Sequence, residues 1–261
     1  MKLAIALMIP LAAYGQMRDN RDKQMTCKGS GYSSQARHCD IREQSIPLPG
    51  PLTTDTGNGG VTVKGWLRND VLIRSMVQTW ADTDAEANAI ANQISVNASA
   101  GVISATGPTN NGHRGWSVSY EIFVPRVTNL NLRTSNGGIS VSDVEGVLGL
   151  RTMNGGIHLA RLAGDVTGAT TNGGVHVELM GNSWQGRQLD VGTTNGGVML
   201  SVPDGFSAHV QATTVNGGIH LDFPLTVTDQ RQRHSIDTNL GSGGALINVS
   251  TVNGGVNLTR S

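Results

Sequence analysis

The sequence has few aromatic residues and little charge. Aromatic side chains make up 4% and charged side chains 15% of its 261 residues. Its 19 basic and 19 acidic residues balance, so it lacks the excess positive charge with which proteins bind nucleic acids or anionic membranes. With 38% hydrophobic residues it is too apolar, and its net charge too small, for a disordered chain. We expect a folded protein without a nucleic-acid partner.

Long apolar runs are also scarce. Residues 3–13 form an apolar run behind Met1 and Lys2, and the run ends in the small residues of Ala13-Tyr14-Gly15. It is shorter than the ~20 residues that a membrane-spanning helix needs, but it has the length and ending of a secretory signal peptide. We therefore predict a signal peptide over residues 1–15, export, and no transmembrane segment. A buried first strand or helix is the alternative interpretation.

Cysteine occurs only twice. Cys27 and Cys39 lie in a polar leader, residues 16–39. An exported chain meets an oxidising compartment in which such a pair can bridge, so we predict a Cys27–Cys39 disulfide. Two free thiols are the alternative. A metal site is less favoured because only His38 lies nearby and a closed zinc site needs four ligands.

Glycine, in contrast, is abundant, with 35 residues that lack the every-third spacing of collagen. Many belong to one pattern, Thr-x-Asn-Gly-Gly-[Ile/Val]-x-[Val/Leu], which identifies an internal repeat. The pattern occurs seven times, over residues 56–63, 134–141, 152–159, 170–177, 193–200, 214–221 and 251–258. Its asparagines are Asn58, Asn136, Asn154, Asn172, Asn195, Asn216 and Asn253.

The motif is typical of a tight turn followed by a strand. Asn and Gly adopt positive φ more readily than other residues, and an Asn-Gly step between alternating apolar residues is a strong turn signal. The apolar residues after it alternate with the period of two of a strand. We predict an all-β fold, a β-solenoid similar to a single-stranded β-helix, with coils of 18–23 residues and the seven Asn residues as structural turns at Asn-Gly-Gly corners. An antiparallel meander is the alternative that the period alone leaves open.

Two other parts of the chain depart from the repeat. Residues 40–126 predict strands over 70–80, 102–105 and 116–124, and an acidic first turn with helical spacing predicts one short helix over 82–94. We expect them to form a β-rich capping module before the solenoid repeat domain, residues 127–261. Residues 224–237, in the longest interval between motif copies, are typical of a hairpin inserted into one coil.

These residues also carry a family resemblance. The repeat series, with Trp116–Pro125 before it and Leu240–Gly244 near its end, resembles the bacterial "putative adhesin" β-strand-repeat family, the toastrack-like domain of unknown function 4097, over about residues 40–259. The resemblance implies a β-helical domain of the bacterial cell envelope, periplasmic or extracellular, with no established enzymatic activity. It supplies no catalytic or binding residues.

The search for chemistry finds little. No carboxylate pair recurs at a fixed offset from the motif, and an acid–base pair could be assembled only from Asp143, Glu145 and Asp165, which we interpret as exposed corner charges. Calcium-binding β-rolls carry an Asp after their glycines that this motif lacks. We predict no catalytic residue and no cofactor.

One column of residues bears on metal binding. The position between the two apolar residues of [Ile/Val]-x-[Val/Leu], which we expect to point inward, is occupied in the last six copies, in chain order, by Ser140, His158, His176, Met199, His220 and Asn257. His158 and His176 are expected on adjacent coils, pointing outward, with Met199 separating them from His220. Two histidines fall short of a tetrahedral site, so we predict no metal and name His158 and His176 as weak candidates.

The four tryptophans are candidates for stacking against sugars. We place Trp66, Trp80 and Trp116 in the core of the capping module, and Trp184 in core or corner packing. The function that we predict is a non-enzymatic exported envelope protein, an adhesin-like structural or interaction module that contacts an envelope protein or a glycan surface. The alternatives are a polysaccharide-active enzyme on a β-helix and an envelope-stress sensing module.

Overall fold

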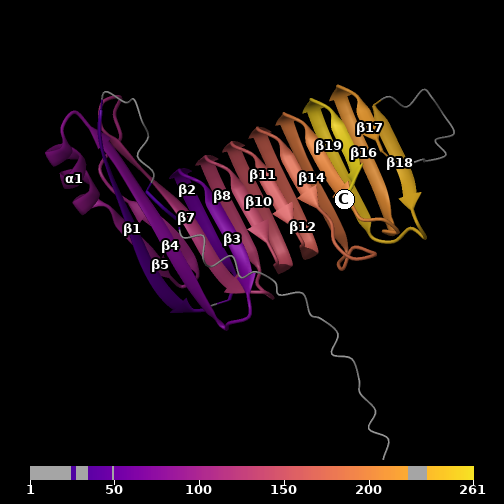
Figure 1. The fold of residues 1–261 in the computed structure, drawn as a ribbon, viewed down its shortest axis with the longest axis horizontal. Coiled ribbons are helices and arrows are strands. Elements are labelled where there is room, and N and C mark those ends of the chain that lie inside the picture. Colours follow the sequence, from indigo (N-terminus) through magenta and orange to yellow (C-terminus); the bar gives the residue numbers. More distant parts are fainter. Residues whose placement is uncertain (1–24, 28–34, 49, 223–233) are drawn as a thin grey trace, which may run out of the picture.

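The fold consists of two β-sheets that face each other and one helix. We describe it from a computed structural model that covers residues 25–27, 35–48, 50–222 and 234–261; the predicted signal peptide lies outside these residues. Figure 1 shows the strands side by side along one long axis, with α1 at one end. The prediction of an all-β fold with one helix is confirmed within the described residues.

Each sheet has ten strands. Sheet A runs in the order β1 (Ala36–Pro47), β4 (Asp70–Ala81), β7 (Gly115–Pro125), β3 (Val61–Trp66), β9 (Ile139–Ser142), β11 (Ile157–Ala160), β13 (Val175–Glu178), β15 (Val198–Val202), β20 (Val256–Arg260), β17 (Ile219–Leu221). Sheet B runs in the order β18 (Ser235–Leu240), β16 (Ala208–Asn216), β19 (Leu246–Asn253), β14 (Gln188–Asn195), β12 (Ala163–Asn172), β10 (Glu145–Asn154), β8 (Leu130–Asn136), β2 (Leu52–Asn58), β6 (Val102–Thr106), β5 (Ser95–Ser99).

The motif copies form a parallel stack, which we call the repeat stack: β2, β3, β8–β17, β19 and β20. In each copy the chain leaves sheet B at the motif Asn, passes through the Gly-Gly pair and enters sheet A. Neighbouring copies pair in parallel and in register, so the motif Asn residues lie opposite one another. Parallel pairing is the arrangement of stacked coils and not of the antiparallel meander.

The repeat stack begins before residue 127, where we expected the capping module to end and the repeat domain to begin. β2 pairs with β8 and β3 pairs with β9, which places the first motif copy directly on the second. The segment between these copies leaves the stack and adds β4, α1, β5, β6 and β7 at its end. The first copy therefore shares its two sheets with the other six.

The last motif copy does not lie at the end of the stack. β19 pairs with β14 on one side and β16 on the other, and β20 lies in the same way between β15 and β17. In Figure 1 the yellow β19 accordingly lies between β14 and β16. Residues 224–233 of the predicted hairpin lie outside the described residues, and its last residues belong to β18, which pairs antiparallel with β16 at the edge of sheet B. The stacking order of the copies therefore differs from their chain order.

Close packing between coils requires the motif glycines, and the positive φ expected at the turn occurs at the first glycine of four copies, Gly59, Gly173, Gly196 and Gly254, with φ from 132° to 159°. No motif Asn has positive φ, nor do Gly137 and Gly155. A Cβ on Gly155 would instead overlap the carbonyl group of Gly137 in the next coil, and one on Gly137 would overlap that of Gly59. Positive φ also occurs at the opposite corner, for example at Gly164, with φ of 100°.

The other motif residues form hydrogen-bonded ladders along the stack. The hydroxyl of Thr170 donates to the carbonyl oxygen of Gly155 at 2.7 Å, and five other motif threonines make the same bond to their neighbouring coil. The side-chain amide of Asn154 donates to Asn136 Oδ1 at 2.8 Å. This Asn ladder runs without interruption through Asn58, Asn136, Asn154, Asn172, Asn195, Asn253 and Asn216. The repeated polar residues therefore stabilise the stacking itself.

At the other end of the molecule, β1, β4 and β7 pair antiparallel. Helix α1 (Asp84–Gln93) begins at Thr83, whose hydroxyl accepts a hydrogen bond from the amide of Glu86. Arg42 of β1 donates to the carbonyl oxygens of Ala91 and Ile94 at the end of this helix, at 3.0 and 2.6 Å. The Ala91 carbonyl oxygen also accepts from the backbone amide of Ile94 at 3.2 Å, and a cation at the C-terminal end of a helix is favourable.

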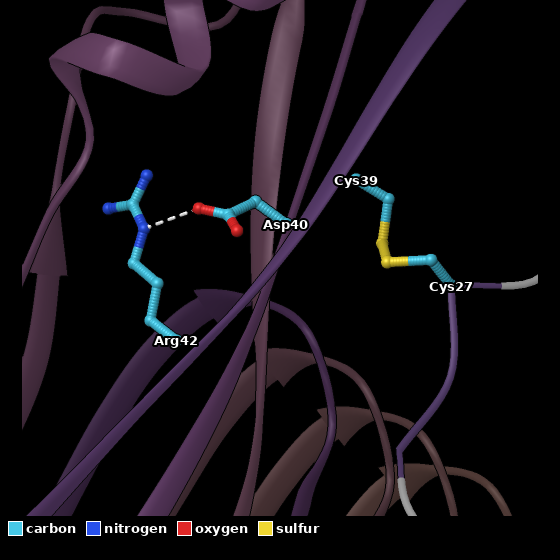
Figure 2. Close-up of a disulfide and its surroundings, with 4 residues drawn as sticks. All are labelled: Cys27, Cys39, Asp40 and Arg42. Atoms are coloured by element: carbon cyan, nitrogen blue, oxygen red, sulfur yellow. Dashed lines mark hydrogen bonds and ion pairs between the residues drawn. A yellow bond between two sulfur atoms is a disulfide. The ribbon is translucent and has the colours of Figure 1, made fainter.

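The predicted disulfide is confirmed. Cys27 and Cys39 are bonded, with their Cα atoms 5.8 Å apart, and the bond ties the leader to β1. Figure 2 shows the disulfide on one side of β1 and the Asp40–Arg42 ion pair on the other. The sequence did not predict β1, because polar residues occupy nearly all positions on both of its faces and it lacks the alternating apolar pattern of a strand.

Candidate functional site

The outer face of sheet A carries the column in which the histidines were expected. Ile157 and Leu159 are buried, while His158 between them is exposed. Strand register gives the order of the column as Thr62, Ser140, His158, His176, Met199, Asn257 and His220. Asn257 and His220 stand in the reverse of their chain order, because the last motif copy is inserted before β17.

A shallow groove follows this column. It has a volume of about 640 Å³. Its floor includes the second glycine of four motif copies, which leave bare backbone between side chains. The glycines are Gly138, Gly156, Gly174 and Gly197, and the column residues that line the groove are Thr62, Ser140, His158, His176, Met199 and Asn257. We call it the glycine groove.

The structure brings His158 and His176 together as predicted. Their rings stack with centroids 4.7 Å apart and an angle of 21° between the planes. Glu178, two residues after His176 on β13, lies on the same face, with its Oε1 3.6 Å from Nε2 of His158. One ligand atom of each of the three side chains lies within 4.8 Å of the others. The arrangement offers two imidazoles and a carboxylate to one ion.

Two of the three carboxylates considered for catalysis, Asp143 and Asp165, form ion pairs between coils, and the third, Glu145, is exposed as expected. Arg161 donates to both oxygens of Asp143, at 2.8 and 2.6 Å, and this bond raises the pKa of Arg161. Asp165 is likewise held by the side chain of Arg187, which keeps the pKa of that carboxyl below its usual value. A carboxyl with a lowered pKa is a poor proton donor near neutral pH. The geometry does not make these groups an acid–base pair.

The tryptophans lie against the protein's own core or glycines. Trp184 is 7% exposed, and its indole N–H donates to the carbonyl oxygen of Gly164 at 3.0 Å. Trp66 packs against Phe123 with ring centroids 5.4 Å apart. The expected core or corner packing is thus observed for both of these tryptophans.

Among the described residues, no helix is long and apolar enough to cross a membrane. The fold and the outer face of sheet A define a class of protein: a two-sheet parallel stack whose recurring geometry comes from a repeated Thr-x-Asn-Gly-Gly motif.

Comparison with known families agrees with that class. The chain matches the family described as Toastrack DUF4097 over residues 33–259 and belongs to this family. A search of curated proteins found no match.

The solved structures to which the chain is similar are distant in sequence. One is described as a putative cell adhesion protein from Clostridium sporogenes, at 10% identity and a TM-score of 0.44, covering 86% of this chain and 100% of that one. Another is described as a putative adhesin from Bacteroides fragilis, at 8% identity and a TM-score of 0.37, covering 85% and 97%. A third, described as a putative lipid binding protein from Parabacteroides distasonis, has 10% identity and a TM-score of 0.26, covering 84% and 96%.

Proposed function

We propose that the protein is a non-enzymatic, exported, adhesin-like interaction module whose contact surface is the glycine groove. The observation that carries the proposal is that the residues of each coil fall into two groups with different roles. The motif Thr, Asn and first Gly are used for stacking, while the second Gly and the column residue line an open groove that runs across several coils.

The ion pairs of the carboxylates support the non-enzymatic part of the proposal. Asp143 and Asp165 each have an arginine partner on the neighbouring coil, as expected for groups that stabilise the stack. The disulfide supports export, since such bonds persist in oxidising compartments. The periplasm and the cell surface both meet this condition.

A glycan is the partner class that the groove favours. Its floor includes bare backbone at four glycines, where a flat sugar ring can approach closely, and hydroxyl and amide groups of Thr62, Ser140 and Asn257 lie along it. Within the described part of the chain, no lysine or arginine lines the groove, which makes it unsuitable for a polyanion. An extended polysaccharide could meet similar groups on successive coils.

Co-sedimentation with insoluble glycans tests this function. We expect the purified protein to sediment with at least one of peptidoglycan, chitin and cellulose, and Ser140→Trp to abolish binding by filling the groove. Asn131→Trp, on the exposed outer face of sheet B, should bind like the wild type.

Three results would overturn the proposal. The first is no sedimentation with any of these glycans, including the case in which the protein binds only an envelope protein. The second is equal binding by the Ser140→Trp variant. The third is the appearance of new reducing or unsaturated ends in the glycan, which would favour the polysaccharide-active enzyme.

A further inference from the structure

We propose that His158, His176 and Glu178 form a surface site for one divalent transition-metal ion of the zinc class. The site goes beyond the proposed contact with glycans and does not depend on it. It arises from three side chains on the outer face of β11 and β13, two adjacent parallel strands of the repeat stack.

Strand register brings the two imidazoles together. His158 lies directly opposite His176, and neighbouring strands are about 4.8 Å apart. The ring centroids are 4.7 Å apart. Two nitrogens that each lie 2.0–2.1 Å from a tetrahedral ion are separated by about 3.4 Å. Rotation of these exposed side chains can bring one nitrogen of each ring to that separation, so the backbone does not have to move.

Glu178 supplies the third ligand. It follows His176 by two residues, and on a strand that spacing puts both side chains on one face. Its Oε1 lies 3.6 Å from Nε2 of His158. Arg161 is close enough to interact with Glu178 electrostatically, but both oxygens of Asp143 bind that guanidinium. The carboxylate therefore remains able to turn toward the histidines.

The donor set determines the class of ion. Imidazole suits zinc, copper and nickel, whereas magnesium and calcium prefer oxygen ligands. Two imidazoles and one carboxylate are an established three-ligand set for zinc, in which the fourth position stays open to water or another ligand. One carboxylate also offsets part of the charge of the ion.

The same column contains a natural control. His220 also points outward, but the residue opposite it is Asn257, and its Nε2 lies 3.0 Å from Oδ1 of Asp222 on its own segment. It has one imidazole where the proposed site has two. Met199, opposite His176, adds a thioether that would favour Cu(I) over zinc if it took part.

Zinc titration of the metal-stripped, untagged protein tests the site. We expect calorimetry to give one ion per chain and thermal unfolding to give a higher Tm with zinc. His158→Ala, His176→Ala and Glu178→Gln should each weaken zinc binding by at least about tenfold, because even partners outside the ligand shell commonly contribute that much. His220→Ala should bind zinc like the wild type.

Cobalt provides a readout that a structural role would not change. Tetrahedral Co²⁺ bound in place of zinc should give visible absorption bands, and these should disappear in the His158→Ala/His176→Ala double variant. All the side chains exchanged are exposed or half-buried, so circular dichroism should show folded variants. Absence of zinc binding by the wild type, or a zinc-dependent Tm shift that survives in the double variant, would overturn the proposal. So would an equal loss in His220→Ala.

Discussion

The repeat stack and the region around β1, β4, β7 and α1 are stabilised in different ways. In the stack the same side chain recurs on each coil, and six of the seven motif Thr residues and all the motif Asn residues bond to a neighbouring copy. At the N-terminal end the contacts are individual. Glu121, 6% exposed, accepts from Lys64 at 2.7 Å and lies 3.4 Å from Arg74, and Phe123 packs beside them.

The difference shows what repetition contributes. A repeated polar residue forms its hydrogen bond with the neighbouring copy of the motif, so the same bond recurs along the whole stack. Polar residues outside the repeat need their own partners, and among the described residues the buried hydroxyls of Thr54 and Tyr120 lack one. An unpaired buried hydroxyl is costly. The stack should therefore be sensitive to changes in its motif residues. Removal of the hydroxyl should be tolerated at Thr54, which lies in β2 before the first motif copy, and at Tyr120 of β7.

Glycine substitution should give the largest effect. A Val at Gly155 would overlap the backbone of Gly137, whereas nothing lies within 4 Å of a Cβ at Gly112 in the N-terminal region. We expect Gly155→Val to lower the free energy of unfolding by more than about 4 kcal/mol, or to prevent folding, and Gly112→Val to change it by less than about 0.5 kcal/mol. Urea denaturation measures both. Similar losses in the two variants would contradict the packing explanation.

The buried threonines should give a smaller effect. Thr170→Val removes the hydrogen bond to Gly155 and should cost about 1–3 kcal/mol. Thr54→Val is the matched control, because the hydroxyl of Thr54 is buried without a partner and its loss should be neutral or stabilising. If both variants lost the same free energy of unfolding, the ladder would not account for the motif threonine.

Tyr120 should have the smallest effect at neutral pH and a larger one in alkali. Burial raises its pKa to about 12, against about 10 in an unfolded chain. Above pH 10 the unfolded state therefore loses its proton first, and the folded state loses stability as the pH rises toward 12, by up to roughly 2–3 kcal/mol. Tyr120→Phe should leave stability at pH 7 unchanged or slightly higher.

Denaturation of both proteins at pH 7 and pH 11 checks this. The variant should lose less stability between the two values than the wild type does. An equal loss would mean that the Tyr120 hydroxyl does not titrate as its burial requires.

The sequence predicted those features that depend on local pattern. The motif indicated the strands after each Gly-Gly pair, and the acidic first turn indicated α1. The insertion of β19 and β20 could not be predicted, because the period describes each coil and not which coil is its neighbour. The close approach of neighbouring coils at the motif glycines could not be predicted for a related reason. The overlap at Gly155 involves a residue of another coil.

The candidate metal site was predicted in part. The column position gave His158 and His176, but Glu178 lies one step beyond the eight-residue motif, where other coils have Ser142, Ala160 and Ser201. The signal that could have found it is the spacing of two between His176 and Glu178, which places both on one face of a strand.

The main feature of this fold is that the spatial order of the coils differs from their order in the chain, since the last motif copy is stacked between two earlier ones. Native-state hydrogen exchange tests it directly, because strands that open together exchange together. The account predicts that residues 246–260 are protected like residues 188–202, and that residues 219–221 of the edge strand β17 exchange faster than both. Exchange of residues 246–260 ahead of both other segments, as in a fraying C-terminal end, would contradict it.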